Sequence, residues 1–252
     1  LIAEYNDLES VENHIEQYPD IAAVILEPVT GNMGVIEPSQ DFIQGLRKLT
    51  KEKNILLICD EVMTGFRSKF GGAQEMLGIE ADITCLGKVI GGGFPVGAYG
   101  ARNEIMENVA PLGGMYQAGT LSGNPIAMAA GMATLLELKK QNPYKKFDKI
   151  AEKIETILLN AGKKYGVDLT VNRFGSMISP FFAKEKIANF TDAQKCDTKK
   201  FATFFWNMIE NGVFLPPSQF ESWFLCSAVT HSDMRKFERA VDLSIAAVAK
   251  QH

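Results

Sequence analysis

Short apolar runs alternate with helix-type segments through the first half of the chain, and this alternation limits the fold more than any other feature. Residues 20–27 and 54–60 are continuous apolar runs, typical of strands buried on both faces. Between them, residues 38–53 combine an early proline with apolar residues at helical spacing, which predicts a helix. Further strands are expected at residues 82–86 and 95–101. Strands that alternate with helices predict an α/β domain with a mainly parallel sheet.

The second half changes character after a long Ala- and Leu-rich helix expected from Pro125 to Leu138. Asn142-Pro143 interrupts the helical pattern, so we place a domain boundary near residues 139–143, which gives domains at 1–140 and 141–252. Mixed short strands and helices then predict a smaller α+β domain. Its expected helices are 144–165, 197–211 and one from Ser232, and its expected strands are 169–173, 177–182 and 223–228.

Composition excludes several classes of protein. The 252 residues carry a net charge of −4 with both signs mixed, and no basic run indicates a nucleic-acid partner. No apolar run approaches the roughly 20 residues that cross a bilayer. The first residues lack the basic and apolar regions of a signal peptide. We therefore expect neither a nucleic-acid partner nor a membrane span.

The cysteines predict buried side chains rather than a metal site. The four cysteines form no C-x-x-C pair and the three histidines are dispersed, so we expect no metal site. Cys59, Cys85 and Cys226 lie in apolar runs and are expected to be small buried hydrophobic residues. Reduced, unpaired cysteines are typical of cytoplasmic proteins, which is the expected location.

Two charged residues at strand ends are the candidates for chemistry. Asp60 ends the most apolar strand, where a carboxylate needs a donor or cation; the alternative is that it caps a following helix. Lys88 follows the next strand, in an apolar, glycine-rich loop. Desolvation there would favour the neutral amine that Schiff-base chemistry needs, whereas the alternative is a surface lysine in a flexible turn.

Asp60 and Lys88 are 28 positions apart, with a helix and a strand expected between them. Both should then lie at one edge of the sheet, where ligands of α/β proteins bind. Pyridoxal phosphate needs this pair, an amine to hold it and a carboxylate to keep its ring nitrogen protonated. A polar loop at residues 115–125, just before a helix, is suited to the phosphate.

These motifs resemble a known family over nearly the whole chain. Residues 58–67 (ICDEVMTGFR) and 84–93 (TCLGKVIGGG) are similar to the signature of class III aminotransferases, which have the fold-type I pyridoxal-phosphate architecture. Within that class, residues 27–34 (EPVTGNMG), 115–125 (MYQAGTLSGNP) and 216–221 (PPSQFE) resemble the glutamate-1-semialdehyde 2,1-aminomutase family. The resemblance implies intramolecular amino transfer from glutamate-1-semialdehyde to 5-aminolevulinate, a precursor of tetrapyrroles, and a homodimer with shared active sites.

The resemblance also implies a role for each matching residue. Lys88 would hold the cofactor, which starts in its pyridoxamine phosphate form, and would move protons. Asp60 would pair with the ring nitrogen, and Val62 would pack on the ring.

The remaining residues are expected around the cofactor and the substrate. The resemblance places Asn32 and Tyr116 near the ring, and Glu221 at the substrate mouth. Thr120 would bind the phosphate across the dimer interface; the alternative is that Thr120 only caps the helix at Pro125.

Other readings of the sequence stay open. The chain begins without Met, and members of the family are longer at the N-terminus, where they carry a phosphate-binding loop and a gating loop. A chain without that part is expected to be inactive. The alternatives are another class III aminotransferase with separate amino donor and acceptor, or a truncated paralogue without catalytic activity.

Overall fold

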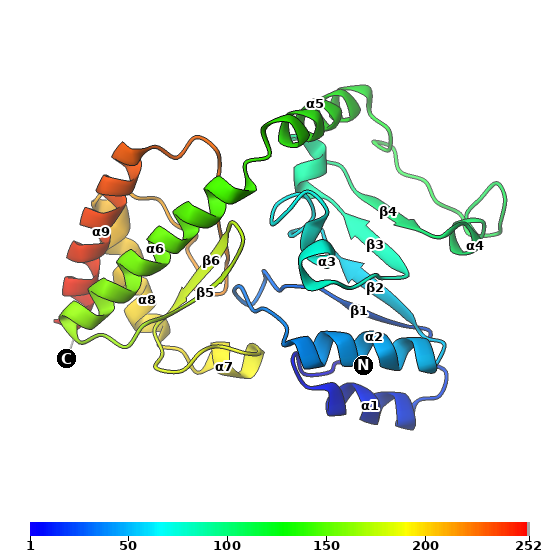
Figure 1. Cartoon of the computed structure of the whole chain (residues 1–252), viewed down its shortest axis with the longest axis horizontal. Helices are drawn as coiled ribbons and strands as arrows, with labels where there is room; N and C mark the ends of the chain where they lie inside the picture. The colour runs from blue at the N-terminus through cyan, green and yellow to red at the C-terminus, as the bar shows by residue number, and fades with distance from the viewer. Residues whose placement is uncertain (251–252) are drawn as a thin grey trace. The chain divides into compact units, whose positions relative to one another are not determined.

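The computed structural model describes residues 1–250, which form two compact units (Figure 1). The first unit comprises Leu1–Pro28 and Ser39–Asn142. The second comprises Val29–Pro38 together with the chain from Pro143 onward. One short segment from the first part of the sequence therefore packs with the C-terminal unit.

A four-stranded sheet forms the centre of the first unit, in the order β1 (Ala23–Leu26), β2 (Leu56–Asp60), β3 (Ile83–Leu86) and β4 (Ala98–Ala101). The first three strands are parallel and β4 is antiparallel to β3. The mainly parallel sheet predicted from the alternation is thus confirmed. The helices of this unit are α1 (Leu8–Gln17), α2 (Gln40–Glu52), α3 (Gly72–Leu77), the 3₁₀ turn η1 (Lys88–Gly91), α4 (Asn103–Met106) and α5 (Pro125–Gln141).

The helices α1 and α2 bury one side of this sheet. Val11 from α1 and Phe42 and Leu46 from α2 form one cluster with Leu57 of β2. Burial on both faces, as the apolar runs predict, is wrong for the described chain: β2 alternates between buried and half-buried residues, and Ile25 of β1 is 64% exposed. The second face of the sheet is therefore only partly covered by the described residues.

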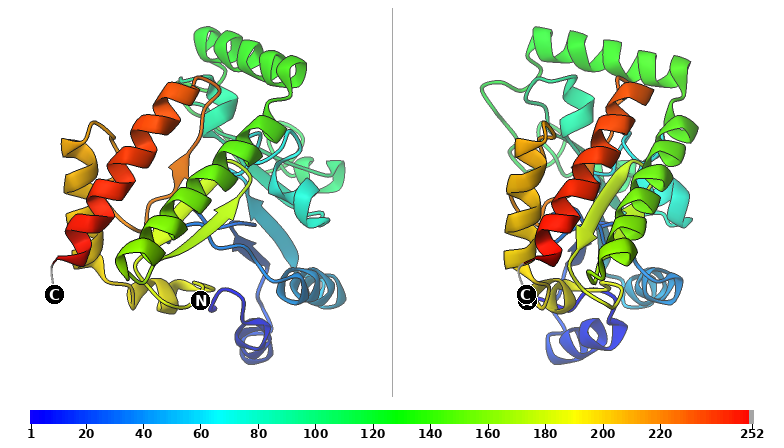
Figure 2. Two further views of the ribbon diagram at one scale, coloured as in Figure 1. Left: turned by 60° about the vertical axis from the view of Figure 1, so that its left-hand side comes forward. Right: turned by 90° about the vertical axis from the view of Figure 1, so that its left-hand side faces the viewer.

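The second unit has a smaller α+β architecture. Its antiparallel sheet has the order β5 (Thr170–Phe174), β6 (Met177–Phe181) and β7 (Trp223–Phe224). Its helices are α6 (Tyr144–Tyr165), α7 (Phe190–Gln194), α8 (Thr198–Glu210) and α9 (His231–Ala249). The long helices α6, α8 and α9 run alongside one another in both views of Figure 2. Leu158, Phe204 and Ile245 from these helices share one core with Ile178 of β6.

The cysteines differ from expectation at one position. All four cysteines are free thiols, and Cys59 is buried and Cys85 half-buried. Cys226 is exposed, so the prediction that it is a buried hydrophobic residue is wrong. The expected strand ends at Phe224, and residues 225–230 form an irregular segment with a turn before α9. Within residues 1–250, no helix has the length and hydropathy to cross a bilayer.

Candidate active site

The carboxyl ends of β2 and β3 bring the two charged candidates to one edge of the sheet. Asp60 is the last residue of β2 and stands opposite Cys85 of the parallel strand β3. Lys88 follows Cys85 by three positions and begins η1 directly after β3. The two residues therefore leave neighbouring parallel strands at the edge where α/β sheets bind ligands.

Asp60 has one carboxylate oxygen occupied and one available. Its Oδ1 accepts a hydrogen bond from the backbone N–H of Val62 at 3.0 Å. No other described donor bonds to this half-buried side chain, so Oδ2 can accept a further hydrogen bond. The following segment is a series of turns, not a helix. The alternative that Asp60 is a helix cap is therefore wrong.

Glu61 fixes the segment that carries Asp60. Its side chain is only 2% exposed and accepts four hydrogen bonds. The donors are Thr64 Oγ1 at 2.6 Å, the N–H groups of Ala73 and Gln74 at 2.9 Å, and Gln74 Nε2 at 3.2 Å. Gln74 Nε2 also donates to Thr84 Oγ1 of β3 at 3.1 Å. From the sequence we assigned no role to Glu61. The feature that could have indicated one is a second acidic residue directly after the strand.

Lys88 stands in a strained backbone conformation. Its φ of +46° lies in the left-handed region, which costs a residue with a Cβ of order 1 kcal/mol or more. Its side chain is exposed, so the expected desolvation is wrong for the described chain. Val62 lies against the start of this turn, because a Cβ on Gly87 would come within 3.1 Å of Val62 Cγ1. Strain of this kind is concentrated at functional sites.

The helix α5 packs directly on the Lys88 turn, and Gly131 makes the approach possible. A Cβ on this buried glycine would overlap the carbonyl oxygen of Ile90. On the turn itself, a Cβ on Gly92 would lie 2.5 Å from the carbonyl oxygen of Ala130, and Gly92 has a φ of +57°. The backbones of α5 and η1 therefore touch without intervening side chains, which holds the turn in place.

The polar loop before α5 is open to solvent. Tyr116 is 84% exposed, and Thr120 is exposed as well. The N-cap of α5 is Asn124, whose Oδ1 accepts from the N–H groups of Ile126 at 3.1 Å and Ala127 at 3.2 Å. The alternative that Thr120 caps this helix is therefore wrong.

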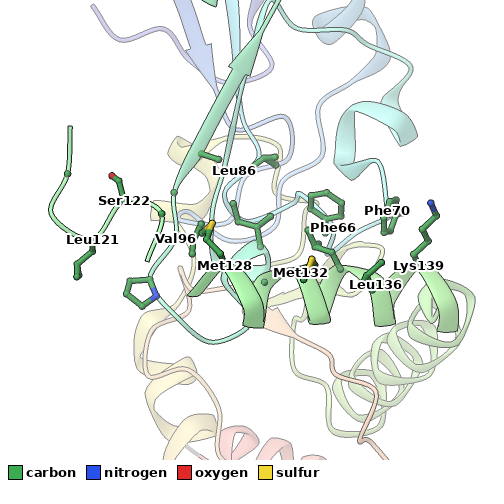
Figure 3. Close-up of a pocket in the computed structure, with 18 residues that line it drawn as sticks. Phe66, Phe70, Leu86, Val96, Leu121, Ser122, Met128, Met132, Leu136 and Lys139 are labelled. Atoms are coloured by element: carbon green, nitrogen blue, oxygen red, sulfur yellow. The ribbon is translucent and has the colours of Figure 1, made fainter. Parts of the chain in front are cut away.

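A cavity of about 1010 Å³ lies between this loop, the Lys88 turn and α5 (Figure 3). Phe66 and Leu86 line one side, and Met128 and Met132 of α5 line another. Ser122 belongs to the loop side. The cavity is mostly apolar, although it adjoins the polar segment that was expected to bind phosphate.

Asn32 and Glu221 lie on two segments that the second unit brings together. The N–H of Gly34 donates to the carbonyl oxygen of Phe220 at 2.7 Å. Ser222 Oγ donates to the carbonyl oxygen of Gly31 at 3.0 Å. The two motifs singled out in the sequence therefore form one bonded pair of loops, while the other five candidates, Asp60, Val62, Lys88, Tyr116 and Thr120, belong to the first unit.

The environment of Cys59 does not favour a reactive thiol at this edge. Burial, and next the charge of Glu61, raises the pKa of the Cys59 thiol to about 12, which removes the reactive thiolate at neutral pH. Among residues 1–250, no three His, Cys, Asp or Glu side chains gather as metal ligands would.

A family model and individual relatives match most of the chain. The model described as "Aminotransferase class-III" matches residues 3–235. A glutamate-1-semialdehyde 2,1-aminomutase from Persephonella marina is 55% identical over 234 residues, which cover 92% of this chain and 54% of the relative. Its counterpart from Aquifex aeolicus is 50% identical, with 90% of this chain and 54% of the relative covered. The chain thus spans about half the length of these curated relatives.

Solved structures agree on the fold. An omega-transaminase from Sphaerobacter thermophilus superposes with a TM-score of 0.89 and 28% identity over 97% of this chain and 56% of that one. A glutamate-1-semialdehyde-aminomutase from Pseudomonas aeruginosa PAO1, in complex with PMP, has a TM-score of 0.87 and 25% identity over 98% and 56%. With the family model covering nearly its full length, the chain belongs to the class III aminotransferase family.

Proposed function

We propose that the protein containing this chain converts glutamate-1-semialdehyde to 5-aminolevulinate by moving an amino group within one molecule, in tetrapyrrole biosynthesis. Relatives that are 50% and 55% identical to the chain carry the name of this enzyme. The observation that carries the proposal is the position of Asp60 and Lys88 at the carboxyl ends of adjacent parallel strands. The chain spans about half of these relatives. We therefore assign the activity to the complete protein that the gene encodes, and we propose that the chain by itself is inactive.

The residues at this edge suit pyridoxal phosphate. The available Oδ2 of Asp60 would accept a hydrogen bond from the protonated ring nitrogen, and the exposed amine of Lys88 would hold the cofactor covalently. When bound, the cofactor supplies an electron sink for the bond-breaking steps. Val62, which already lies against the Lys88 turn, would pack on the ring, and Asn32 and Tyr116 would lie near it.

Lys88 would also carry protons during the reaction. A lysine amine that is released from the cofactor would accept a proton from a carbon of the substrate or of the cofactor and return it to the other. The strained turn and its packing against Gly131 would keep the amine in one position for both transfers. Glu221 would stand at the substrate mouth as an acid that attracts the amino group of the substrate.

We further propose that the active protein is a cytoplasmic homodimer. Several large apolar side chains on the loop and on α5 are more than half exposed. Exposed apolar patches of this kind are typical of surfaces that another protein covers. They are Leu121 at 61%, Ile126 at 64%, Met132 at 63% and Leu136 at 60%. Thr120 precedes Leu121. In a dimer formed through this surface, Thr120 would therefore lie at the interface and bind the cofactor phosphate of the second subunit. The unpaired cysteines support the location.

A borohydride experiment tests the role of Lys88. Reduction of the protein with bound pyridoxal phosphate should leave a pyridoxyl group on the peptide that contains Lys88, and Lys88→Ala should abolish it. Lys139→Ala, a lysine on α5 in the same unit, should keep the label. A label on any other lysine overturns the assignment.

Two assays separate the alternatives. An aminomutase forms 5-aminolevulinate without an external keto acid, whereas another class III aminotransferase needs a separate amino acceptor. A paralogue without catalytic activity would show no absorbance from bound pyridoxal phosphate.

A further inference from the structure

A second cavity, of about 710 Å³, lies wholly within the second unit, and none of its lining residues is named above for catalysis. It is open to solvent on one side and is lined by the first two turns of α6, the loop that precedes α9, and the start of α9. Its volume is within the range of small-molecule sites. The residues that line it are Lys145, Lys146, Lys149, Ile150, Ser227, Ala228, Val229, Thr230, His231 and Met234.

The charge of this cavity is of one sign. Three lysines line it and none of the lining residues is acidic. Within residues 1–250, Lys145, Lys146 and Lys149 form no ion pair, and the first turn of α6 contains no acid. Lysines spaced three and four residues apart repel one another, and cations at a helix N-terminus are opposed by the helix dipole. Folding of the described residues therefore gains no ion pair from these lysines, and their mutual repulsion opposes it.

The walls of the cavity are held in place by other contacts. Lys146 Nζ donates to the carbonyl oxygen of Ser227 at 2.9 Å, which ties the loop to α6. The acids that adjoin the lining residues in sequence, Asp148 on α6 and Asp233 on α9, do not line the cavity, and the Asp233 carboxylate accepts from the N–H of Thr230 at 2.9 Å and from Thr230 Oγ1 at 2.7 Å. Within residues 1–250, Lys145 and Lys149 therefore have no ion-pair partner. They lie on α6, which the Lys146 contact ties to the loop.

Part of the lining of the cavity is apolar. Ile150, Val229 and Met234 supply it, and all three also pack against the core of the second unit. A cavity lined by both cations and a fixed apolar surface matches an anion that carries an apolar group. A dianionic phosphate uses two ammonium groups better than a carboxylate does, because it has more charge and more acceptor oxygens.

We propose that this cavity binds a small phosphate monoester, with the phosphate on Lys145 and Lys149 and the organic part against Ile150 and Val229. The site is separate from the cofactor phosphate, which the proposed function assigns to Thr120. The proposal does not depend on that function.

Calorimetric titration tests the proposal with three probes: phenyl phosphate, inorganic phosphate and benzoate. The protein is used as its gene encodes it, with pyridoxal phosphate already bound so that its own phosphate site is filled. Phenyl phosphate should bind most tightly, because it uses both the cationic and the apolar parts of the lining. The double variant Lys145→Gln/Lys149→Gln keeps the Lys146 contact and should weaken phenyl phosphate at least tenfold.

The matched control is Lys199→Gln/Lys200→Gln. These lysines also lie in the first turn of a helix, α8, but the carboxylate of Asp197 bonds their N–H groups and neither lines the cavity. The control should bind phenyl phosphate as the unchanged protein does, and circular dichroism checks that both variants fold. Equal losses in the two double variants, or equal affinity for all three probes, would reduce the site to non-specific surface charge and overturn the proposal.

Discussion

Asp82 and Arg47 form an ion pair with two contacts, of 2.7 and 3.1 Å, and both side chains are about nine-tenths buried. The pair joins α2 to the start of β3. Arg102 adds a third contact at 3.1 Å, and the N–H of Leu57 a fourth at 2.8 Å. Burial alone raises the pKa of Asp82, but the hydrogen bonds from Arg47, Leu57 and Arg102 outweigh it and lower the pKa from 3.8 to about 2.

Replacing Asp82 with Asn should therefore destabilise the protein in a pH-dependent way. At pH 7 we expect a loss of about 3–5 kcal/mol, because Arg47 keeps a buried, unpaired charge. A lowered pKa adds stability above the unfolded value of 3.8, and that stability is lost as pH falls towards 2. Urea unfolding at several pH values should show the two proteins converging between pH 4 and 2.

The exposed pair of Lys48 and Glu52, 3.8 Å apart, provides the control. Lys48→Ala should change stability by less than about 0.5 kcal/mol at every pH, since exposed ion pairs contribute little. A constant difference between Asp82→Asn and the unchanged protein across the acid range would show that the pKa of Asp82 is the same in the folded and unfolded states.

Asp60→Asn should leave the cofactor bound and slow the reaction. The amide keeps the size of the side chain and its bond to Val62, but it cannot hold a proton on the ring nitrogen. Turnover should fall about 100-fold or more, the usual effect of losing one group that stabilises transition-state charge. Stopped-flow absorbance measures this rate, and the exposed Glu80→Gln serves as control. Near-normal turnover would leave Asp60 a structural residue.

Two inactive variants should restore activity when mixed, if the active sites are shared between subunits. Lys88→Ala lacks the amine and Thr120→Val lacks the phosphate ligand. A mixed dimer would contain one site with Lys88 from one subunit and Thr120 from the other, and a second site with both lesions. Activity should rise towards half that of the unchanged dimer. Heterodimers verified by mass that stay inactive would place Thr120 in the site of its own subunit.

Gly131→Ala should disturb the Lys88 turn from the side of α5. The added methyl group overlaps the carbonyl oxygen of Ile90, and overpacking of this kind costs about 1–3 kcal/mol. Thermal unfolding measures the loss, and the amount of borohydride-fixed label measures the displacement of Lys88. Gly100→Ala, where a Cβ would meet no atom within 4 Å, should leave the label unchanged. Full labelling of Gly131→Ala would show that the turn does not depend on this contact.

Gln219→Leu should stabilise the fold. The side chain of Gln219 is 3% exposed, and within residues 1–250 neither its Oε1 nor its Nε2 has a hydrogen-bond partner. Replacing an unsatisfied buried amide should add about 1 kcal/mol. Its neighbour Ser218 provides a control of opposite sign, because Ser218→Ala removes the acceptor for the N–H of Phe220 at 3.2 Å. A loss of stability in Gln219→Leu would reveal a bonded partner for the amide.

The elements of the fold were largely predictable because local signals agreed with one another. The helix expected at residues 144–165 is α6 as observed, since its apolar stripe and the Pro143 and Gly166 boundaries are all local. The parallel edge with Asp60 and Lys88 followed from strand order alone. The exposure of Cys226 and Lys88 was not predictable, because an apolar neighbourhood in sequence does not specify what packs on a loop.

The contacts that hold the site were harder to predict for the same reason. Glu61 bonds to residues up to 13 positions away, and its acceptor role depends on where α3 begins. The left-handed backbone of Lys88 has no signal in its own side chain. The pairing of Gly34 with Phe220 joins parts of the chain separated by more than 180 positions, which no local pattern encodes.

The passage of Val29–Pro38 into the second unit constrains how this protein can be dissected or recombined. A cut after Asn142 does not yield two self-sufficient modules, because the C-terminal piece leaves behind the loop that bonds to Phe220 and Ser222. A chimaera that exchanges the C-terminal unit between relatives must carry three junctions, at 28/29, 38/39 and 142/143. The second unit therefore depends on residues 29–38, which are encoded within the first half of the sequence. We expect the sequences of these two parts to change together in evolution.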